Sequence, residues 1–515
     1  MVDHDSFLMR KFAFGSMVTL SGVLLGSGFL FAFQVACTRL FGPKYYGFLV
    51  ISLTVVEFIR IACSLGMPRG GMRYLSVAIG AKHFHQISDI IAVTLTIPFL
   101  ICAGAGVLLF ISADEIAVWW FRNPELGPFL ALFSICLPFI AIIGCGVELS
   151  RGFSNTLYAT FTENVFLHGS WLIWTLLFFI MGLGYYSMAL AVIATSIGCA
   201  VLIILFLKRQ VKSLTGESFS RTSFIGIKYK SLKYKDIITY SIPLFLTGFI
   251  IVAVNSVNII MLGRFCKETE VGIYAAASVI SMLLSRLLIM PVNSILSPMI
   301  ATEFGGGRID NIRQLYLTST RWLCYAATPI ATLIIIARNP IMSLFGNAFI
   351  LEGSVALLIL TIGQYVNCTT GITGILLAMT GHQKLELWAN VSTLSLNIAL
   401  NLILIPRLGI IGAATSNMIS QVVINGIRVL ITNAIFRVQP ITMCQAGLFF
   451  MSLALIAIFF WIKPWFSGLM FDIFFAGISA LAIVGSTYRL FLTDADKALL
   501  RSLVNRKMKM NRPVF

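Results

Sequence analysis

Two arginines lie inside stretches that are otherwise apolar enough to cross a membrane. Arg60 falls within residues 47–66, and Glu57 precedes it by three residues, on the same face of a helix. Arg286 falls within residues 271–296, a stretch that contains no acidic residue. A charge at bilayer depth costs about 3 kcal/mol or more, so each guanidinium needs a partner or a water-filled cavity. These arginines are therefore the first candidates for binding an anionic ligand.

The planar guanidinium fork matches phosphate oxygens in pairs, which favours a phosphate-bearing ligand. Gln34, Asn255 and Asn258, also in apolar runs, would extend the polar wall of such a site. The same three residues could equally form ordinary hydrogen bonds between helices. Glu57 has two readings as well, a counter-ion for Arg60 or a site that couples transport to a proton or cation. We favour the counter-ion.

The composition indicates an all-α polytopic membrane protein. Hydrophobic residues make up 58% of the 515 residues, charged residues 11%, and the mean hydropathy is +0.93, whereas soluble proteins have about 25% charged residues. A spanning helix needs about 20 mostly apolar residues, and the continuous runs exclude the alternating pattern of a barrel. Fourteen spans are predicted, near residues 12–36, 47–66, 87–111, 127–147, 163–182, 186–207, 237–262, 271–296, 313–337, 353–378, 386–406, 410–434, 442–462 and 467–488.

The net charge of +17 is explained by membrane topology, so no nucleic-acid partner is expected. With the N-terminus inside, cytoplasmic segments carry 26 of the 37 Lys and Arg residues and the opposite side carries 8. This asymmetry satisfies the positive-inside rule and places both termini in the cytoplasm. The longest connection, residues 208–236, is strongly basic and joins two halves.

An internal repeat appears when the sequence is shifted by 225 residues. Arg39 then aligns with Arg264, Gly47 with Gly272, and Gly184 with Gly409. Spans 1–6 and 7–12 therefore form two parallel copies, related by an axis along the membrane normal, with the ligand path between them. The predicted parts are an N-terminal six-helix lobe (1–210), a basic cytoplasmic linker (211–236), a C-terminal six-helix lobe (237–437), two appended spans (438–490) and a basic cytoplasmic tail (491–515).

Several classes of chemistry lack their motifs. There is no G-x-x-x-x-G-K-[ST] sequence, which argues against an ATP-driven pump and gives no reason to expect a cofactor. The ten cysteines contain no C-x-x-C and lie almost entirely within apolar runs, so no disulfide framework is predicted. His83 and His85 lie in a basic loop and are interpreted as solvated residues, so no metal site and no catalytic residues are proposed.

One stretch resembles the opening signature of bacterial polysaccharide-biosynthesis flippases, the O-antigen repeat-unit translocases. The residues that carry this resemblance are Arg39, Gly42, Pro43, Tyr46, Gly47, Leu65, Gly66, Met67 and Pro68. The second half is similar through Gly272-Ile-Tyr-Ala and Gly409-Ile-Ile-Gly-Ala-Ala, and the resemblance covers roughly residues 10–435.

The resemblance implies membership of the multidrug/oligosaccharidyl-lipid/polysaccharide exporter superfamily, with two lobes in a V and alternating access. It also implies a bacterial inner-membrane location and an undecaprenyl-pyrophosphate-linked oligosaccharide as substrate. Partners would be membrane lipids and the glycan polymerase and chain-length machinery. Arg60 and Arg286 match cavity arginines of the lipid II flippase by span, although that protein's first-helix arginines have no counterpart here.

Other readings stay open at this point. A lipid II-type flippase and a cation-coupled drug exporter share the fold, but a drug exporter would need more acidic residues in its cavity. A membrane-embedded glycosyltransferase or polymerase would elongate sugar chains. A non-transporting scaffold would tolerate neutral residues in place of both arginines.

Overall fold

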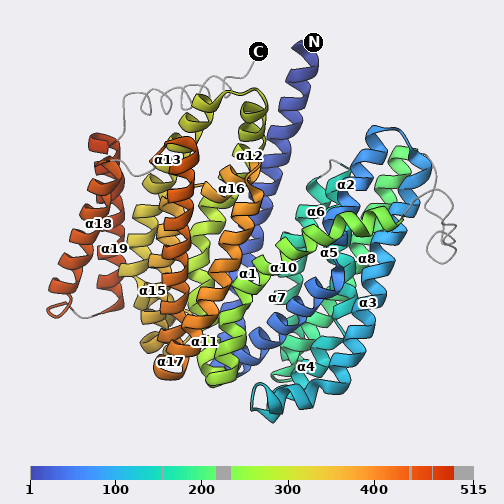
Figure 1. Ribbon diagram of the computed structural model, residues 1–515. Coiled ribbons are helices and arrows are strands. Elements are labelled where there is room, and N and C mark those ends of the chain that lie inside the picture. Colours follow the sequence, from blue (N-terminus) through green and yellow to red (C-terminus); the bar gives the residue numbers. More distant parts are fainter. Residues whose placement is uncertain (1, 154–155, 216–233, 440–442, 467, 492–515) are drawn as a thin grey trace, which may run out of the picture. The chain divides into compact units, whose positions relative to one another are not determined.

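The described part of the chain is built from helices. The computed structural model describes the chain except residues 1, 154–155, 216–233, 440–442, 467 and 492–515 (Figure 1). The first half contains α1 (Val2–Ser64), α2 (Met67–Gly80), α3 (Phe84–Trp119), the short helix η1 (Pro124–Leu126), α4 (Gly127–Ser134), α5 (Leu137–Gly152), α6 (Thr156–Thr160), the π-helix η2 (Phe161–Phe166), α7 (Leu167–Ile180) and α8 (Tyr186–Thr215). The rest contains α10 (Tyr234–Phe265), α11 (Glu268–Leu284), the π-helix η3 (Ser285–Ile289), α12 (Met290–Gly305), α13 (Ile309–Ile336), α14 (Arg338–Ser343), η4 (Asn347–Phe349), α15 (Ile350–Thr369), α16 (Thr373–Met379), α17 (Gln383–Phe436), α18 (Met443–Ile462), α19 (Leu469–Ser486) and η5 (Thr487–Phe491).

The membrane spans agree with the hydropathy pattern. Within the described residues, 11 helices are long and apolar enough to cross a membrane, or 12 when the bent pair α4 and α5 is taken as one span. Two of these helices, α1 and α17, each hold two predicted spans that meet at a glycine with non-helical backbone angles, Gly42 and Gly409. Dividing both helices there gives the fourteen predicted spans. The polytopic all-α fold is confirmed.

The repeat is visible in the backbone as well as in the sequence. Gly184 and Gly409, which align under the 225-residue shift, adopt left-handed φ values of 56° and 55°. The same shift relates the end of α2 at Gly80 to the end of α12 at Gly305. It also relates the starts of α3 and α13. A left-handed φ at both aligned glycines is a specific match, because residues with a Cβ rarely adopt it.

The two copies touch through one reciprocal contact. A Cβ built on Gly47 would lie 2.0 Å from the backbone oxygen of Glu268, and one on Gly272 would lie 2.3 Å from that of Pro43. Pro43 and Glu268 are themselves 225 residues apart in the sequence, so each half presents the same surface to the other. A two-fold relation between the repeats requires this reciprocity. Only glycine permits the close backbone approach on both sides.

The chain forms two compact units, which we describe separately. Unit 1 contains Met1–Ala276, Phe345–Glu352 and Asn390–Ser416, and unit 2 contains Ala277–Leu344, Gly353–Ala389 and Asn417–Phe515. The units divide the chain differently from the sequence repeats, because α10 belongs to unit 1. The lobe boundaries at 1–210 and 237–437 therefore stay predictions. Most of the predicted linker (211–236) and nearly all of the tail (491–515) lie outside the described residues.

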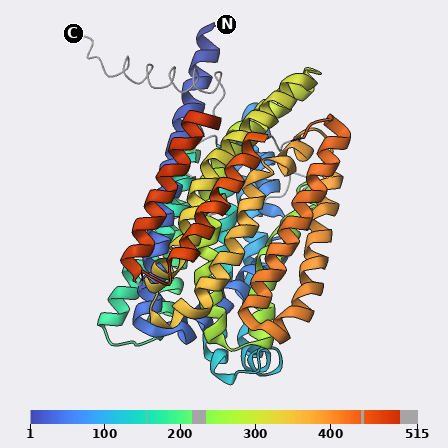
Figure 2. The same ribbon diagram turned by 90° about the vertical axis from the view of Figure 1, so that its left-hand side faces the viewer.

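Each unit has its own apolar core. In unit 1, α2, α3, α5 and α8 meet around Leu75, Ile91 and Leu149. In unit 2, α12, α13 and α16 pack together around Tyr316 and Leu376. Figures 1 and 2 show α18 and α19 beside α13 at one edge of unit 2. α2 was not predicted, because the hydropathy pattern treats residues 67–86 as a loop.

Candidate functional site

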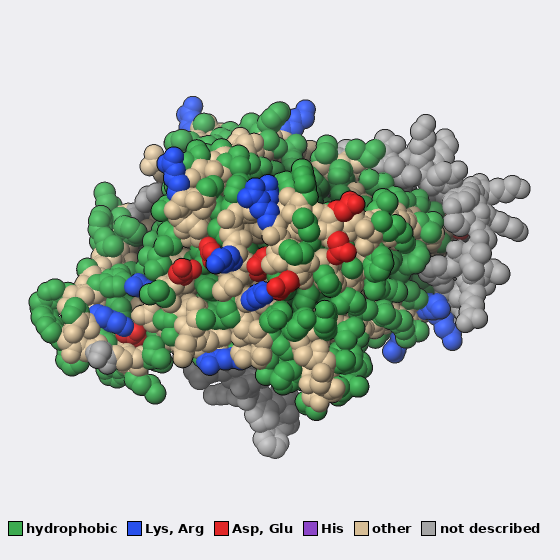
Figure 3. Space-filling model, turned by 90° about the horizontal axis from the view of Figure 1, so that it is seen from below, with side chains coloured by type: hydrophobic (Ala, Val, Ile, Leu, Met, Phe, Trp, Pro, Cys, Tyr) green, Lys and Arg blue, Asp and Glu red, His purple; other side chains and the backbone are tan. Residues whose placement is uncertain are grey.

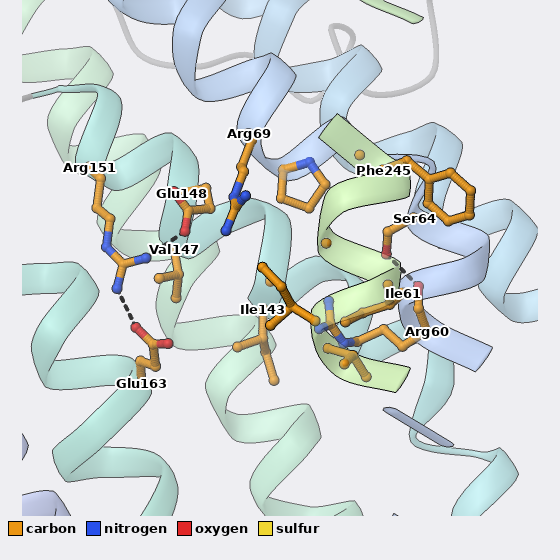
Figure 4. A pocket seen from close by; sticks show the side chains of 16 residues that line it. Arg60, Ile61, Ser64, Arg69, Ile143, Val147, Glu148, Arg151, Glu163 and Phe245 are labelled. Atoms are coloured by element: carbon orange, nitrogen blue, oxygen red, sulfur yellow. Dashed lines mark hydrogen bonds and ion pairs between the residues drawn. The ribbon is translucent and has the colours of Figure 1, made fainter. Parts of the chain in front are cut away.

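Unit 1 contains a pocket beside the junction of α1 and α2. Its volume is about 280 Å³, and α1, α2, α5, η2 and α10 contribute its walls (Figure 4). The charged lining residues are three arginines and two glutamates: Arg60, Arg69, Arg151, Glu148 and Glu163. The remaining lining residues are mostly apolar: Ile61, Ser64, Gly66, Pro68, Ile143, Gly144, Val147, Phe245, Gly248, Ile251 and Val252. A pocket with apolar walls and a few converging polar groups is typical of a ligand site.

A sharp turn between α1 and α2 brings two of these arginines to the pocket. Leu65 and Gly66 both have left-handed φ values, 50° and 71°, and a Cβ on Gly66 would lie 2.2 Å from the Ser241 backbone oxygen of α10. Pro68 then occupies the first turn of α2, where its missing N–H costs nothing. The chain therefore ends one helix just after Arg60 and begins the next just before Arg69.

Arg60 is held by Glu57 in a two-pronged ion pair. Its Nε donates to Glu57 Oε2 at 2.7 Å and its Nη2 to Glu57 Oε1 at 2.6 Å. The Arg60 side chain is 15% exposed and that of Glu57 42% exposed. Nη1 makes no hydrogen bond with the described residues and faces Gly144, where an added Cβ would lie 2.8 Å away. In this structure Glu57 acts as counter-ion while one edge of the guanidinium stays available.

Arg151 joins two glutamates on neighbouring helices. Its Nη1 donates to Glu148 Oε1 and its Nη2 to Glu163 Oε2, each at 2.5 Å. Glu163 lies in the π turn η2, which packs against α1 where Gly22 and Gly26 allow close approach. π turns are frequent at functional sites because they redirect side chains. Both glutamates of the pocket are therefore engaged in ion pairs with Arg151.

Arg69 differs from the other two arginines of the pocket. Figure 4 shows its side chain reaching down from α2 toward the space between Glu148 and Arg60. It is exposed and makes no hydrogen bond or ion pair with a described residue. An anion that enters this pocket would meet Arg69 without displacing a carboxylate.

Substitution of Gly144 should impair the pocket without unfolding the protein. A valine there would push on Arg60 Nη1, which is the far end of a flexible side chain and can move at small cost. We expect Gly144→Val to weaken binding of an anionic ligand in the pocket several-fold at an unchanged membrane level of the protein. Gly104→Ala, at a position with open space around it, is the control and should bind like wild type. Unchanged binding by Gly144→Val would show that the position of the guanidinium is unimportant.

The polar residues predicted to extend the wall do not line this pocket. Asn255 lies one turn beyond Ile251 on α10, is exposed, and donates to the Ile251 backbone oxygen. Asn258 is buried and accepts a 2.8 Å hydrogen bond from Asn401 of α17. Gln34 of α1 is buried, and its Oε1 has no hydrogen-bond partner among the described residues. A ligand role for all three stays a prediction.

Arg286 belongs to unit 2, in the π turn η3. Among the residues that the structure describes it has no hydrogen bond and no ion pair. The adjacent Ser285 donates to Gln364 Oε1 at 2.5 Å and accepts from Asn367 Nδ2 at 3.4 Å. Arg286 thus carries an uncompensated charge within a span, next to a serine that contacts polar side chains of α15, and in a span an anionic ligand stabilises such a charge.

Sequence reasoning missed the second half of the pocket. Arg69 lies in a stretch whose hydropathy is that of a loop, and the three-residue spacing of Glu148 and Arg151 is that of an ordinary local ion pair. The contribution of Glu163 depends on the packing of α6 and η2 against α5, and no local pattern predicts it. Gly66 and Pro68 could have predicted the position of Arg69. A glycine turn followed by a proline indicates that a new helix begins at once, so its first residues lie beside the end of the previous helix.

Comparisons with known proteins address both family and fold. The model of the family described as polysaccharide biosynthesis protein matches residues 36–350, more than half of the chain. A comparison with curated proteins finds no match.

Solved structures share the fold at low sequence identity. The lipid II flippase MurJ in an inward closed conformation is 16% identical with a TM-score of 0.68, and the match covers 93% of this chain and 99% of that one. An inward-facing multidrug resistance MATE transporter of the MOP superfamily is 14% identical with a TM-score of 0.68, covering 82% and 98%. A MOP superfamily transporter from Pyrococcus furiosus is 15% identical with a TM-score of 0.58, covering 83% and 96%. With the two-lobe fold of these transporters and the family match over most of its length, the chain belongs to the polysaccharide biosynthesis protein family.

Proposed function

We propose that this protein is a flippase that moves an undecaprenyl-pyrophosphate-linked oligosaccharide across the bacterial cytoplasmic membrane by alternating access. The observation that carries the proposal is Arg286, a cation inside a span that no described residue neutralises. An unpaired charge inside a span is costly, and an anionic substrate would remove that cost. The family match and the fold shared with a lipid II flippase support the same class of cargo.

Arg60 and Arg286 would both bind the pyrophosphate. Arg60 keeps its Glu57 counter-ion and offers Nη1 to the ligand, whereas Arg286 offers its whole fork. Gln34, Asn255 and Asn258 would serve the sugar or the path around it. The polyprenyl tail would stay in lipid, and rocking of the two lobes would expose the sugar on the far side. The protein then catalyses no covalent reaction.

The positive charge of the loops supports an orientation with both termini in the cytoplasm of a bacterial cell. The substrate would then enter from the inner leaflet, and the polymerase and chain-length machinery would act on it after release. The Arg69 side of the pocket lies at the end of the spans that this orientation assigns to the cytoplasm. Arg69 would therefore be among the first cations that the pyrophosphate meets.

Transport can be tested with the purified full-length protein in proteoliposomes. The vesicles carry a polyprenyl-pyrophosphate oligosaccharide, and a membrane-impermeant glycosidase reports the leaflet that the sugar faces. We expect the protein to expose the protected sugar at a rate well above that of empty vesicles. No acceleration would contradict the proposal. Sugar-chain elongation would instead indicate a polymerase, and cation-coupled export of a cationic dye would indicate a drug exporter.

A further inference from the structure

A second group of charges lies in unit 2, where α13 ends and the α18–α19 hairpin turns. Lys463 follows the last residue of α18, and Asp472 lies in the first turn of α19. Lys463 Nζ donates to both carboxylate oxygens of Asp472, which is 1% exposed. The ammonium has three N–H groups, so this pair leaves capacity for one more acceptor.

Arg338, the first residue of α14, adds a second cation to this group. Its guanidinium carbon lies 4.8 Å from the centre of the Phe460 ring, which covers one face of the fork. No described residue forms a hydrogen bond or ion pair with it, and its Nε is buried without a partner. Burial lowers the pKa of Arg338, and the Asp472 carboxylate partly opposes that effect, so both cations act on one carboxylate. The group therefore has a surplus positive charge and an unused donor.

The surroundings of the group are apolar and aromatic. Exposed hydrophobic side chains of α18, α19 and their turn include Phe460, Trp461, Trp465, Met470 and Phe474. The rings of Trp461 and Trp465 meet edge to face with centroids 4.8 Å apart. At the left edge of Figure 3, below these helices, Lys and Arg side chains are set among hydrophobic ones. Tryptophans at the end of a span are typical of the zone between lipid tails and headgroups.

We propose that this corner binds the headgroup phosphate of an anionic phospholipid. The phosphate contacts the Arg338 fork and the free N–H of Lys463, and the acyl chains lie along the exposed side chains of α18 and α19. The ligand is a lipid because a free phosphate would leave the apolar surroundings unused. Anionic headgroups supply the negative charge that Asp472 alone does not. The bound lipid would fix the appended hairpin against α13.

The test uses the purified full-length protein in detergent and counts retained lipids by native mass spectrometry. Phosphatidylglycerol and phosphatidylcholine are titrated separately into wild type, Arg338→Gln, Arg338→Lys and Arg407→Gln. Arg407 is an exposed arginine of α17 in unit 1 and serves as the matched loss of one charge. Since a hydrogen bond to a charged group contributes measurably, we expect Arg338→Gln to weaken phosphatidylglycerol retention by about tenfold or more. Arg407→Gln should retain it like wild type, and Arg338→Lys should lie between.

Three results would overturn the proposal. Equal phosphatidylglycerol retention by Arg338→Gln and wild type would remove the arginine from the site. Phosphatidylcholine bound as tightly as phosphatidylglycerol would remove the requirement for negative charge. Displacement of the lipid by inorganic phosphate at similar concentration would assign the site to a free anion. Should Arg338→Gln fail to fold, the comparison of Arg338→Lys with wild type decides, because a lysine keeps the charge but loses the planar fork.

Discussion

Replacing Arg286 with alanine should abolish surface glycan while leaving the amount of protein in the membrane unchanged. The substitution removes an unpaired charge from a span. It should therefore not weaken membrane insertion or folding, and it can make their free energy more favourable by up to about 3 kcal/mol. Under the proposed function, transport loses the guanidinium that contacts the pyrophosphate, a loss of at least about tenfold for a charge-assisted contact. The measurement is surface glycan and membrane protein level in a strain that lacks the chromosomal gene.

Two companion variants make the result specific to the guanidinium. Arg286→Lys keeps the charge but not the fork, and should restore only part of the export. Arg407→Ala removes an exposed arginine that has no partner among the described residues and should export normally. Normal glycan with Arg286→Ala would exclude Arg286 from the mechanism. A loss of the protein itself would show that the arginine is structural.

Features with a local cause could be predicted from the sequence. The Glu57–Arg60 pair follows from a three-residue spacing on one helix, and the spans follow from length and hydropathy. The repeat also followed from the sequence, because Gly184 and Gly409 adopt a φ that other residues rarely adopt, and Gly47 and Gly272 permit a close backbone approach. The reciprocal contact at Gly47 and Gly272 gives that alignment its structural cause.

Features that depend on distant pairing could not be predicted. Asn258 and Asn401 are far apart in sequence, yet they form one buried hydrogen bond. Arg151 of α5 pairs with Glu163 of the π turn η2, and the hydrophobic periodicity of the sequence does not predict a π turn. α2 contains two arginines and three glycines within 14 residues, so its hydropathy resembles that of a loop although its tertiary contacts make it a helix.

Cross-linking Asn123 to Glu268 should stop transport reversibly. Asn123 belongs to the first repeat and Glu268 begins α11 in the second, and Asn123 Nδ2 donates to Glu268 Oε1 at 2.7 Å. This bond lies beside the Gly47–Glu268 contact, so the two repeats are joined at this end of the spans. Under the proposed alternating access, that end opens once in each cycle. A short reversible thiol reagent across Asn123→Cys and Glu268→Cys would hold it closed, and a reductant would restore transport.

The chain supplies a matched control for the cross-link. Lys44 and Glu125 are also paired at this end, at 2.6 Å, but both belong to the first repeat. A link between Lys44→Cys and Glu125→Cys should therefore leave transport intact. The nearby native thiol interferes little, since burial raises the pKa of Cys266 to about 12 and keeps it protonated at neutral pH, and Cys266→Ser removes it entirely. Full transport by the Asn123–Glu268 cross-linked protein would mean that this contact never opens, because a covalent bond between the repeats is incompatible with their separation.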